Sequence, residues 1–410
     1  MSLVSALFTG VTGLSGQSQA LEVIGDNISN VNTVGFKSSR PVFGDILSTI
    51  LNNGSTNSQI GRGSQLSGVI QSFNQGSFES SDNALDLAID GSGFFVVSQN
   101  GGDFFSRAGQ FRLNDNGLVQ NITGQVLQGN QITNGVTSAT RSDVDLAGVQ
   151  SAPQASTAFT LGANLNAAAS SGTTFTSPVS TFNSLGTQNV LSITFTKVAG
   201  SNQHSYAILP STGTITAGAS GTVTFDTSGQ LSLVNGAAVA DQTISLTFTG
   251  DPAAADQTLT WDLAGASGTN GKLTGFAASS NNNSVVQDGF STGTLVGLSV
   301  NGTGIIQGLF NNGQTENLFE VAMADFLAPT GLTRSGSNLF AESADSGSPV
   351  FGTATAGGFG GIVGSSLELS NVDLSAQFVT LIQTQQAFQA AARIINTTDD
   401  LLTETVNLVR

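Results

Sequence analysis

Apolar residues near the C-terminal end advance in alternating steps of four and three. The stretch from Ser370 to Arg410 contains no Gly and no Pro. Its stripe consists of Leu374, Phe378, Leu381, Phe388, Ala392, Ile395, Leu402, Val406 and Val409. This spacing is typical of a helix that packs on another helix. We predict a coiled-coil helix over 370–410, opened by the capping pattern Ser370-Asn371-Val372-Asp373.

The N-terminal end carries a second stripe with the same rhythm, which predicts a helix over 1–31. The stripe consists of Leu3, Leu7, Leu14, Leu21, Ile24, Ile28 and Val31. Four glycines lie among these positions, and each costs up to about 1 kcal/mol of helix propensity. Such a helix needs a partner. Matching stripes at the two ends predict that the termini pack together as an inner core domain.

The intervening sequence favours β-structure. Residues 32–75 are polar and rich in small residues, which predicts an extended connector. Within 76–150, the segments 111–113 and 118–119 flank Asn114-Asp115-Asn116-Gly117, a hairpin signal. Short strands rich in Thr, Ser, Val and Phe recur in 151–284, at Leu191–Thr196, Thr222–Phe225, Ile244–Phe248 and Leu259–Trp261. They predict an inserted all-β domain, with barrel and sandwich both open. The predicted fold class is mixed, mainly β with terminal α-helices.

Composition and charge narrow the function classes. Hydrophobic residues make up 39% of the chain, with 26 Phe, which is enough to build cores. The net charge of −16 argues against a nucleic-acid partner. The absence of Cys excludes disulfides and thiolate metal sites. Neither a Sec-type signal peptide nor an apolar run long enough to span a membrane is present, so we expect no membrane association.

Candidate chemistry is sparse. His204 is the only histidine, so neither a Ser-His-Asp arrangement nor a zinc site is expected. Asn114-Asp115-Asn116-Gly117 lacks the acidic spacing of a Ca²⁺ loop. The segment from Gly265 to Lys272 lacks the spacing and the hydroxyl residue of a phosphate-binding loop. We interpret both segments as turns, and we predict no catalytic residue, cofactor or metal.

Each terminal helix is accompanied by a short motif. The N-terminal motif contains Asn27, Asn30, Gly35, Phe36 and Lys37. The C-terminal motif contains Ser370, Asn371, Val372 and Asp373. Together these motifs resemble the bacterial flagellar rod and hook proteins. The stretch from Leu85 to Gly129 is similar to the same family through Arg107-x-Gly109-x-Phe111 and a neighbouring Gly-rich motif.

Further motifs favour hook over rod. Phe225-Asp226-Thr227-Ser228-Gly229-Gln230-Leu231 in the insert resembles hook proteins in particular. Several motifs in 285–365 do the same, including Gly336-x-Asn338-Leu339-Phe340. The resemblance places 285–365 with 76–150 in one β-rich middle domain.

This resemblance implies a structural protein. It implies a homo-polymer of many copies, a curved tube that couples the rod to the filament as a universal joint. The distal rod protein, the hook cap and the hook–filament junction proteins are the implied partners. Export through the flagellar type III apparatus without a cleaved signal peptide, to an extracellular position, is implied as well. The alternatives are a distal rod subunit, acting as a rigid driveshaft, and a secreted β-rich adhesin or glycan-acting protein.

Overall fold

The computed structural model describes residues 3–53, 56–248, 254–265 and 272–408. The chain divides into two compact units. The first comprises 1–148, 297–308 and 316–410, and the second comprises 149–296 and 309–315. Strands β26 (Gly293–Val300) and β27 (Ile305–Phe310) contribute residues to both units. The predicted fold class, mainly β with a helix near each end, is confirmed. None of the described helices has the length and apolar character needed to cross a bilayer.

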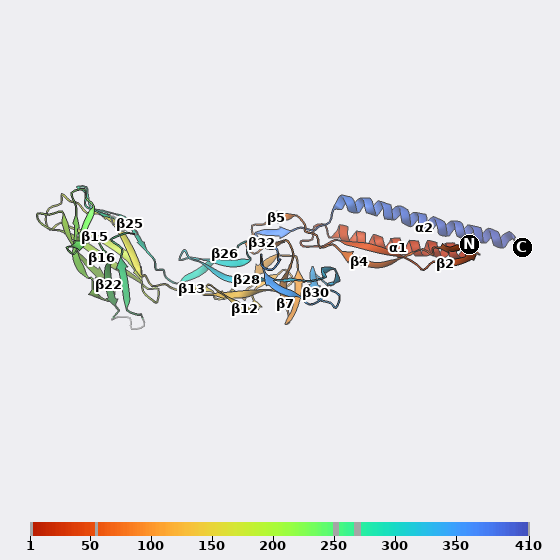
Figure 1. The fold of residues 1–410 in the computed structure, drawn as a ribbon, viewed down its shortest axis with the longest axis horizontal. Helices are drawn as coiled ribbons and strands as arrows, with labels where there is room; N and C mark the ends of the chain where they lie inside the picture. Colours follow the sequence, from red (N-terminus) through yellow and green to blue (C-terminus); the bar gives the residue numbers. More distant parts are fainter. Residues whose placement is uncertain (1–2, 54–55, 249–253, 266–271, 409–410) are drawn as a thin grey trace. The chain divides into compact units, whose positions relative to one another are not determined.

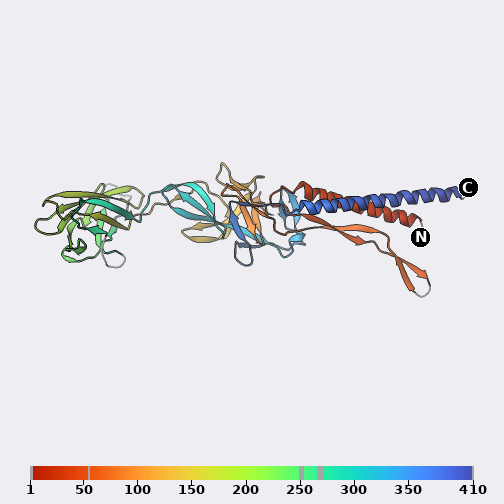
Figure 2. The same cartoon turned by 90° about the horizontal axis from the view of Figure 1, so that it is seen from above.

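Two long helices of the first unit lie side by side and antiparallel, with the chain termini at the same end (Figures 1 and 2). They are α1 (Leu3–Ser29) and α2 (Leu374–Leu408). The capping prediction for α2 was wrong by three residues. Asp373 caps the helix, because its Oδ1 accepts from the backbone N–H groups of Ser375 (2.9 Å) and Ala376 (3.1 Å). Ser370 lies outside the helix and accepts from Val372 N at 3.4 Å.

The segment predicted as an extended connector contains paired strands. Strand β1 (Ser39–Asp45) pairs antiparallel with β4 (Ser64–Gln71), and β2 (Thr49–Asn53) pairs with β3 (Thr56–Ile60). The β1–β4 ribbon runs along α1 (Figure 1). A Cβ on Gly16 of α1 would lie 3.2 Å from the ring of Phe43, so glycine lets β1 approach the helix closely.

The remainder of the first unit is a β-rich part. Its main sheet runs in the order β28-β11-β7-β8-β30-β29. The predicted hairpin is present, with Leu113 of β9 opposite Val119 of β10. Phenylalanines fill the core, and Phe94 makes edge contacts with Phe73, Phe326 and Phe340 at 5.5–5.9 Å. The elements are β5 (Phe78–Ser80), β6 (Leu87–Asp90), β7 (Phe94–Gln99), β8 (Gly102–Ser106), β9 (Phe111–Leu113), β10 (Val119–Asn121), β11 (Val126–Thr133), β12 (Val136–Asp143), β28 (Thr315–Asp325), η1 (Pro329–Gly331), β29 (Thr333–Gly336), β30 (Leu339–Ala341), β31 (Val350–Thr353), β32 (Gly361–Gly364) and β33 (Ser366–Glu368).

The second unit is a sandwich of two sheets. One has the order β18-β22-β23-β14-β24, with β25 paired to β14, and the other has the order β15-β16-β17-β19-β20-β21. Its strands are β13 (Gln150–Ser151), β14 (Ala158–Asn164), β15 (Thr174–Phe182), β16 (Gln188–Lys197), β17 (Gln203–Pro210), β18 (Thr214–Ala217), β19 (Ser220–Phe225), β20 (Leu231–Val234), β21 (Ala237–Ala238), β22 (Gln242–Thr247), β23 (Gln257–Trp261), β24 (Leu273–Thr274) and β25 (Asn281–Gln287). Three of the four strands predicted here lie within these bounds, and the fourth, Ile244–Phe248, extends one residue beyond the end of β22. The turn expected over 265–272 falls mostly outside the described residues.

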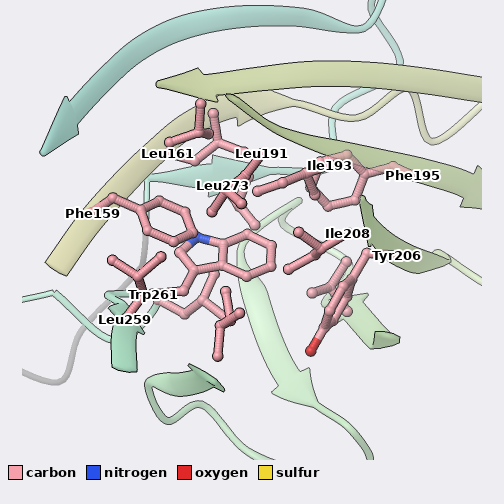
Figure 3. Packing of buried hydrophobic residues seen from close by; sticks show 14 of the residues in the cluster. Phe159, Leu161, Leu191, Ile193, Phe195, Tyr206, Ile208, Leu259, Trp261 and Leu273 are labelled. Carbon is pink, nitrogen blue, oxygen red and sulfur yellow. The ribbon is translucent and has the colours of Figure 1, made fainter. Parts of the chain in front are cut away.

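The core of this sandwich surrounds Trp261 (Figure 3). Phe159 stacks on the indole with ring centroids 5.8 Å apart, and Tyr206 meets it edge-on at 5.2 Å. Both sheets supply side chains, since Phe159 and Trp261 come from one and Phe195 and Tyr206 from the other. Such complete burial of large side chains makes the sandwich stable through its own contacts.

Candidate functional site

The seam is the set of positions at which α1 and α2 face each other. About half of its positions differ by one residue from the stripe predicted from the sequence. In α2 the positions turned inward are Gln377, Leu381, Thr384, Phe388, Ala391, Ile395, Thr398 and Leu402. In α1 they are Ala6, Gly10, Gly13, Gln17, Ala20, Ile24 and Asn27. Both series keep the alternating steps of three and four. Four predicted positions of α2 lie on the observed seam: Leu381, Phe388, Ile395 and Leu402. At the alternate positions the inward residue is the one before the predicted residue, as with Gln377 before Phe378 and Ala391 before Ala392.

Small side chains explain this offset. A Cβ on Gly10 would lie 2.9 Å from Cγ1 of Ile395, and one on Gly13 would lie 3.7 Å from Cβ of Ala391. The two backbones therefore approach closely only where Gly, Ala and Thr face each other. The Thr384 hydroxyl, on the seam, donates to the carbonyl of Thr380 (2.8 Å) and so leaves no polar atom unpaired there.

A second apolar surface remains on the helices. Leu374, Phe378 and Val406 of the predicted stripe are exposed, and Leu7, Leu14, Leu21, Ile28, Val31 and Ala392 are half-buried. Val4, Phe8 and Val11 of α1 are exposed as well, as are Val379, Ile382, Ile394 and Leu401 of α2. The side chain of Leu3 and residue Val409 lie outside the described part. An apolar surface of this extent on a helix pair is typical of an interaction face.

Two asparagines of the terminal motifs join the helices to the ribbon. Asn27 is buried, its Nδ2 donates to the carbonyl of Ser39 (2.7 Å), and its Oδ1 accepts from Ser39 N (2.8 Å). Asn371 accepts from Ser38 N (2.8 Å) and donates to the carbonyls of Ser72 (2.8 Å) and Asn74 (3.0 Å). The structure thus brings the N-terminal and C-terminal motifs together around the start of β1.

A buried ion cluster lies beside this junction. Nζ of Lys37 is 2.6 Å from Oε1 of Glu368, and both side chains are fully buried. Arg107 lies 3.5 Å from the other oxygen of Glu368. Gly76 N and the carbonyl of Asn74 complete the hydrogen bonds, at 2.9 Å each. Burial lowers the pKa of Lys37, and the carboxylate of Glu368 opposes that shift. The cluster connects the residues just before β1 and just after β8 with the end of β33. Removing one member leaves an uncompensated buried charge.

The remaining motif residues shape the turn between α1 and β1. Gly35 has φ +68°, and a Cβ there would meet the backbone of Ala108. The Phe36 ring lies under the guanidinium of Arg334, at 5.1 Å. Asn30 donates to Asp26 O (2.9 Å) and accepts from the Thr33 hydroxyl. Val372 is half-buried beside Asn371. The contacts of these residues therefore fix the conformation of the turn between α1 and β1.

Sequence reasoning missed three charged residues of this junction. Glu368, Arg107 and Arg334 were not predicted as site residues, although Arg107 lies inside a motif that resembles the family. Glu368 is 331 residues from Lys37 in the chain. The sequence signal for Glu368 is weak: charged residues make up only 9% of the chain, and the burial that requires a partner for the charge is visible only in the structure.

Possible metal ligands and the single histidine are the remaining candidates for chemistry among the described residues. The described residues contain no group of three or more His, Cys, Asp or Glu that could hold a metal ion. His204 lies buried in the sandwich, edge-on to Phe225 at 6.0 Å and opposite Lys197 across the strand pair. Burial and the Lys197 charge lower its pKa to about 4, so it is neutral at physiological pH.

Comparison with family models gives matches along most of the chain. The four descriptions are Flagella basal body rod protein (residues 7–37), Flagellar hook protein FlgE/F/G D1 domain (88–162), Flagellar basal body protein FlaE D2 domain (152–290) and Flagellar basal body rod FlgEFG protein C-terminal (363–408). The first and last of these cover most of α1 and all of α2, and the third covers most of the sandwich.

Whole-length relatives carry one name. The flagellar hook protein FlgE of Borreliella burgdorferi is 30% identical over 447 residues, covering 99% of this chain and 100% of that protein. The hook protein of Treponema pallidum is 30% identical over 100% of both chains, and that of Escherichia coli is 30% identical over 98% and 100%. The Helicobacter pylori hook protein FlgE2 has a solved structure, with a TM-score of 0.43 at 14% identity over 69% of this chain and 98% of that one. By its whole-length similarity to the first three, the chain belongs to the flagellar hook protein family.

Proposed function

We propose that this chain is the structural subunit of a bacterial flagellar hook, and that many copies assemble into a curved helical tube. The tube acts as a universal joint that transmits torque from the rod to the filament. The observation that carries the proposal is the exposed apolar surface on α1 and α2. The small-residue seam uses one face of each helix, and the leucines and phenylalanines beside it are left for neighbouring copies.

Within the tube, the helix pair forms the inner core and the sandwich the outer part. Helix α1 contains glycines at positions 10, 13, 16 and 25, and each of them lowers the stability of the isolated helix. Ordering of both helices is therefore coupled to assembly. In hydrogen exchange of a proven monomer, both helices should exchange at coil rates and become protected in the polymer. Slow exchange across 374–408 in the monomer would contradict this coupling.

The same family membership supports a set of partners and a route. We infer export of the unfolded chain through the flagellar type III apparatus, followed by growth between the distal rod protein and the hook cap and later contact with the hook–filament junction proteins. The protein works outside the cell as a structural element with no catalytic step. Labelled antibody on intact cells tests this location: binding to the hook is expected, and exclusive recovery from the cytoplasm of flagellated cells would contradict it.

Negative-stain images of polymer grown from purified chain test the assignment. Curved, supercoiled tubes are the expected product. Straight rigid rods would instead indicate the distal rod subunit, and monomers at every concentration would contradict both. The deletion of 155–280, within the second unit, sharpens the test because the interface helices lie outside it. We expect this variant to keep assembling while the curvature of its tubes changes.

A further inference from the structure

An ordered loop of the first unit presents one leucine fully to solvent. Leu327 is 98% exposed, although its neighbour Phe326 is buried in the core. The loop is held in place on both sides. Asp325 accepts from Phe326 N (2.8 Å), Gly331 N donates to Ala328 O (2.9 Å), and the Ser343 hydroxyl donates to Gly331 O (2.6 Å). The side chain of Leu327 therefore adds nothing to the core of its own chain.

A second exposed apolar residue accompanies it. Val350 of β31 stands opposite Asp325 of β28 in the register, two residues before Leu327, and is 62% exposed. A single exposed leucine is common on protein surfaces and needs no explanation. A fixed, fully exposed leucine at the same strand end as an exposed valine is a more specific feature. The same unit also contains a hollow that could accept such an apolar side chain.

That hollow has about 230 Å³ and lies between two turns. Its walls are Ala108, Gln110, Asn121, Ile122, Thr123, Ser337 and Asn338. Ile122 is 58% exposed, so its apolar surface is unused in the single chain. None of the lining residues carries a charge. The other hollows described on this unit contain Lys37 and Arg334, Arg107 and Asp325, or Glu342, and these would have to lose hydration on contact with an apolar side chain.

The walls of the hollow are rigid. Asn338 donates to the carbonyl of Val34 (2.8 Å) and its own carbonyl accepts from the Ser106 hydroxyl (2.9 Å). The Asn121 side chain accepts from the backbone N–H groups of Thr123 (3.1 Å) and Gln125 (2.9 Å). A preformed hollow binds an apolar group without the cost of ordering loops first.

We propose that Leu327 of one copy inserts into the Ile122 hollow of a second copy of this chain. The proposal rests on the proposed hook function and deepens it by naming one contact. The loop and the hollow share no residue, so the contact joins different surfaces of two copies. A contact between unlike surfaces is heterologous, and repeated heterologous contacts generate open helical assemblies rather than closed dimers. A second copy fits best because this one chain supplies both the apolar group and the uncharged hollow.

Disulfide cross-linking tests the contact cleanly, since the chain has no Cys. Subunits with Leu327→Cys are mixed with subunits with Thr123→Cys, polymerised and oxidised. Covalent dimers are expected from this mixture. The matched control pairs Leu327→Cys with Val136→Cys, at the first residue of β12, whose side chain is 70% exposed. This control should stay uncrosslinked. Polymers without dimers overturn the contact and leave the hook assignment standing, whereas failure of the unmodified chain to polymerise overturns both.

If the Cys subunits do not copolymerise, a second measurement tests the Leu327 contact. The critical concentration for assembly is compared for Leu327→Asn and Val136→Asn, after circular dichroism has shown both to be folded. We expect at least a tenfold rise for Leu327→Asn and less than a twofold change for Val136→Asn. Equal critical concentrations for the two variants overturn the proposal.

Discussion

The sandwich core and the helix seam bury apolar groups in opposite ways. Around Trp261, large rings from both sheets enclose one another, and Phe159, Phe195 and Trp261 are at most 1% exposed (Figure 3). Between α1 and α2 most of the buried positions are small or polar, namely Gly10, Ala20, Asn27, Thr384, Ala391 and Thr398, with Ile24 as a large apolar side chain buried among them. The large seam residues Leu381, Phe388, Ile395 and Leu402 are only half-buried. The first arrangement is complete within one chain, whereas the second leaves an apolar surface that, under the proposed function, further copies cover.

This difference separates folding from assembly in the same molecule. Burial of large side chains supplies stability within the chain, so the sandwich does not depend on contacts with other copies. Small side chains allow close backbone approach but remove little apolar area from water. A helix pair of this kind stays marginal until neighbours cover its second apolar surface. Mutations in the two regions should therefore change different measurements.

Phe159→Ala should give the largest effect of those considered. Removing a stacked, buried ring leaves a cavity beside Trp261 and should destabilise the sandwich by about 3–5 kcal/mol. The single Trp of the chain reports the transition by fluorescence during denaturant unfolding. Leu209→Ala, at a position on β17 that is 73% exposed, is the control and should change stability by less than about 0.5 kcal/mol. Equal effects of the two substitutions would show that the sandwich core is not the stabilising element.

Sequence patterns predicted large apolar groups better than small ones. The strands around Trp261 and the presence of both helices followed from periodicity, because Leu, Ile, Val and Phe mark a buried face directly. The seam register was offset because the pattern followed larger apolar residues such as Phe378, whereas small residues such as Thr384 and Ala391 occupy part of the seam. Their role is close approach of two backbones, which only the folded pair reveals. Glu368 was missed for another reason, since its partner Lys37 is distant in sequence and a lone acid carries no periodic signal.

Lys37→Met should destabilise the junction by about 3–5 kcal/mol, because the fully buried carboxylate of Glu368 loses its closest partner. Thermal unfolding followed by circular dichroism should report the loss in the first unit. The Trp261 transition should stay unchanged. The double variant Lys37→Met with Glu368→Gln removes both charges and should recover part of the loss. If the double variant loses the sum of the two single effects, the charges are not coupled.

The stability of the sandwich should depend on pH through the buried His204. Its pKa is about 4 in the folded protein, lowered from 6.5, so the fold favours the neutral ring. The resulting stability is complete above pH 6.5 and is lost as the pH falls from 6.5 toward 4. By about pH 4.5 the sandwich should lose roughly 2–3 kcal/mol relative to His204→Gln. Urea unfolding at several pH values, read by Trp261 fluorescence, measures the difference. Parallel pH profiles of the two proteins would rule out a role for His204 in acid sensitivity.

Leu381→Ala should change the stability of the monomer least and the critical concentration for assembly most clearly. Leu381 belongs both to the predicted stripe and to the observed seam, whereas Gln383 is exposed on the far side of α2. If neighbouring copies complete the burial of Leu381, Leu381→Ala leaves a cavity that costs at least about 2 kcal/mol per subunit. That loss raises the critical concentration for assembly about thirtyfold, since about 1.4 kcal/mol is a factor of ten. Gln383→Ala should leave it within about threefold.

The choice of controls follows from the seam register. Thr384 is buried on the seam and its hydroxyl donates to Thr380 O (2.8 Å), so replacing it would disturb the same interface. Thr380 is exposed and is a second suitable control beside Gln383. Trp261 fluorescence should show the same unfolding transition for every variant, because α2 belongs to the other unit. If Leu381→Ala assembles at the concentration of the unmodified chain, the helix pair is not the part of the molecule that assembly completes. The contrast between a self-sufficient sandwich and a partner-dependent seam would then fail.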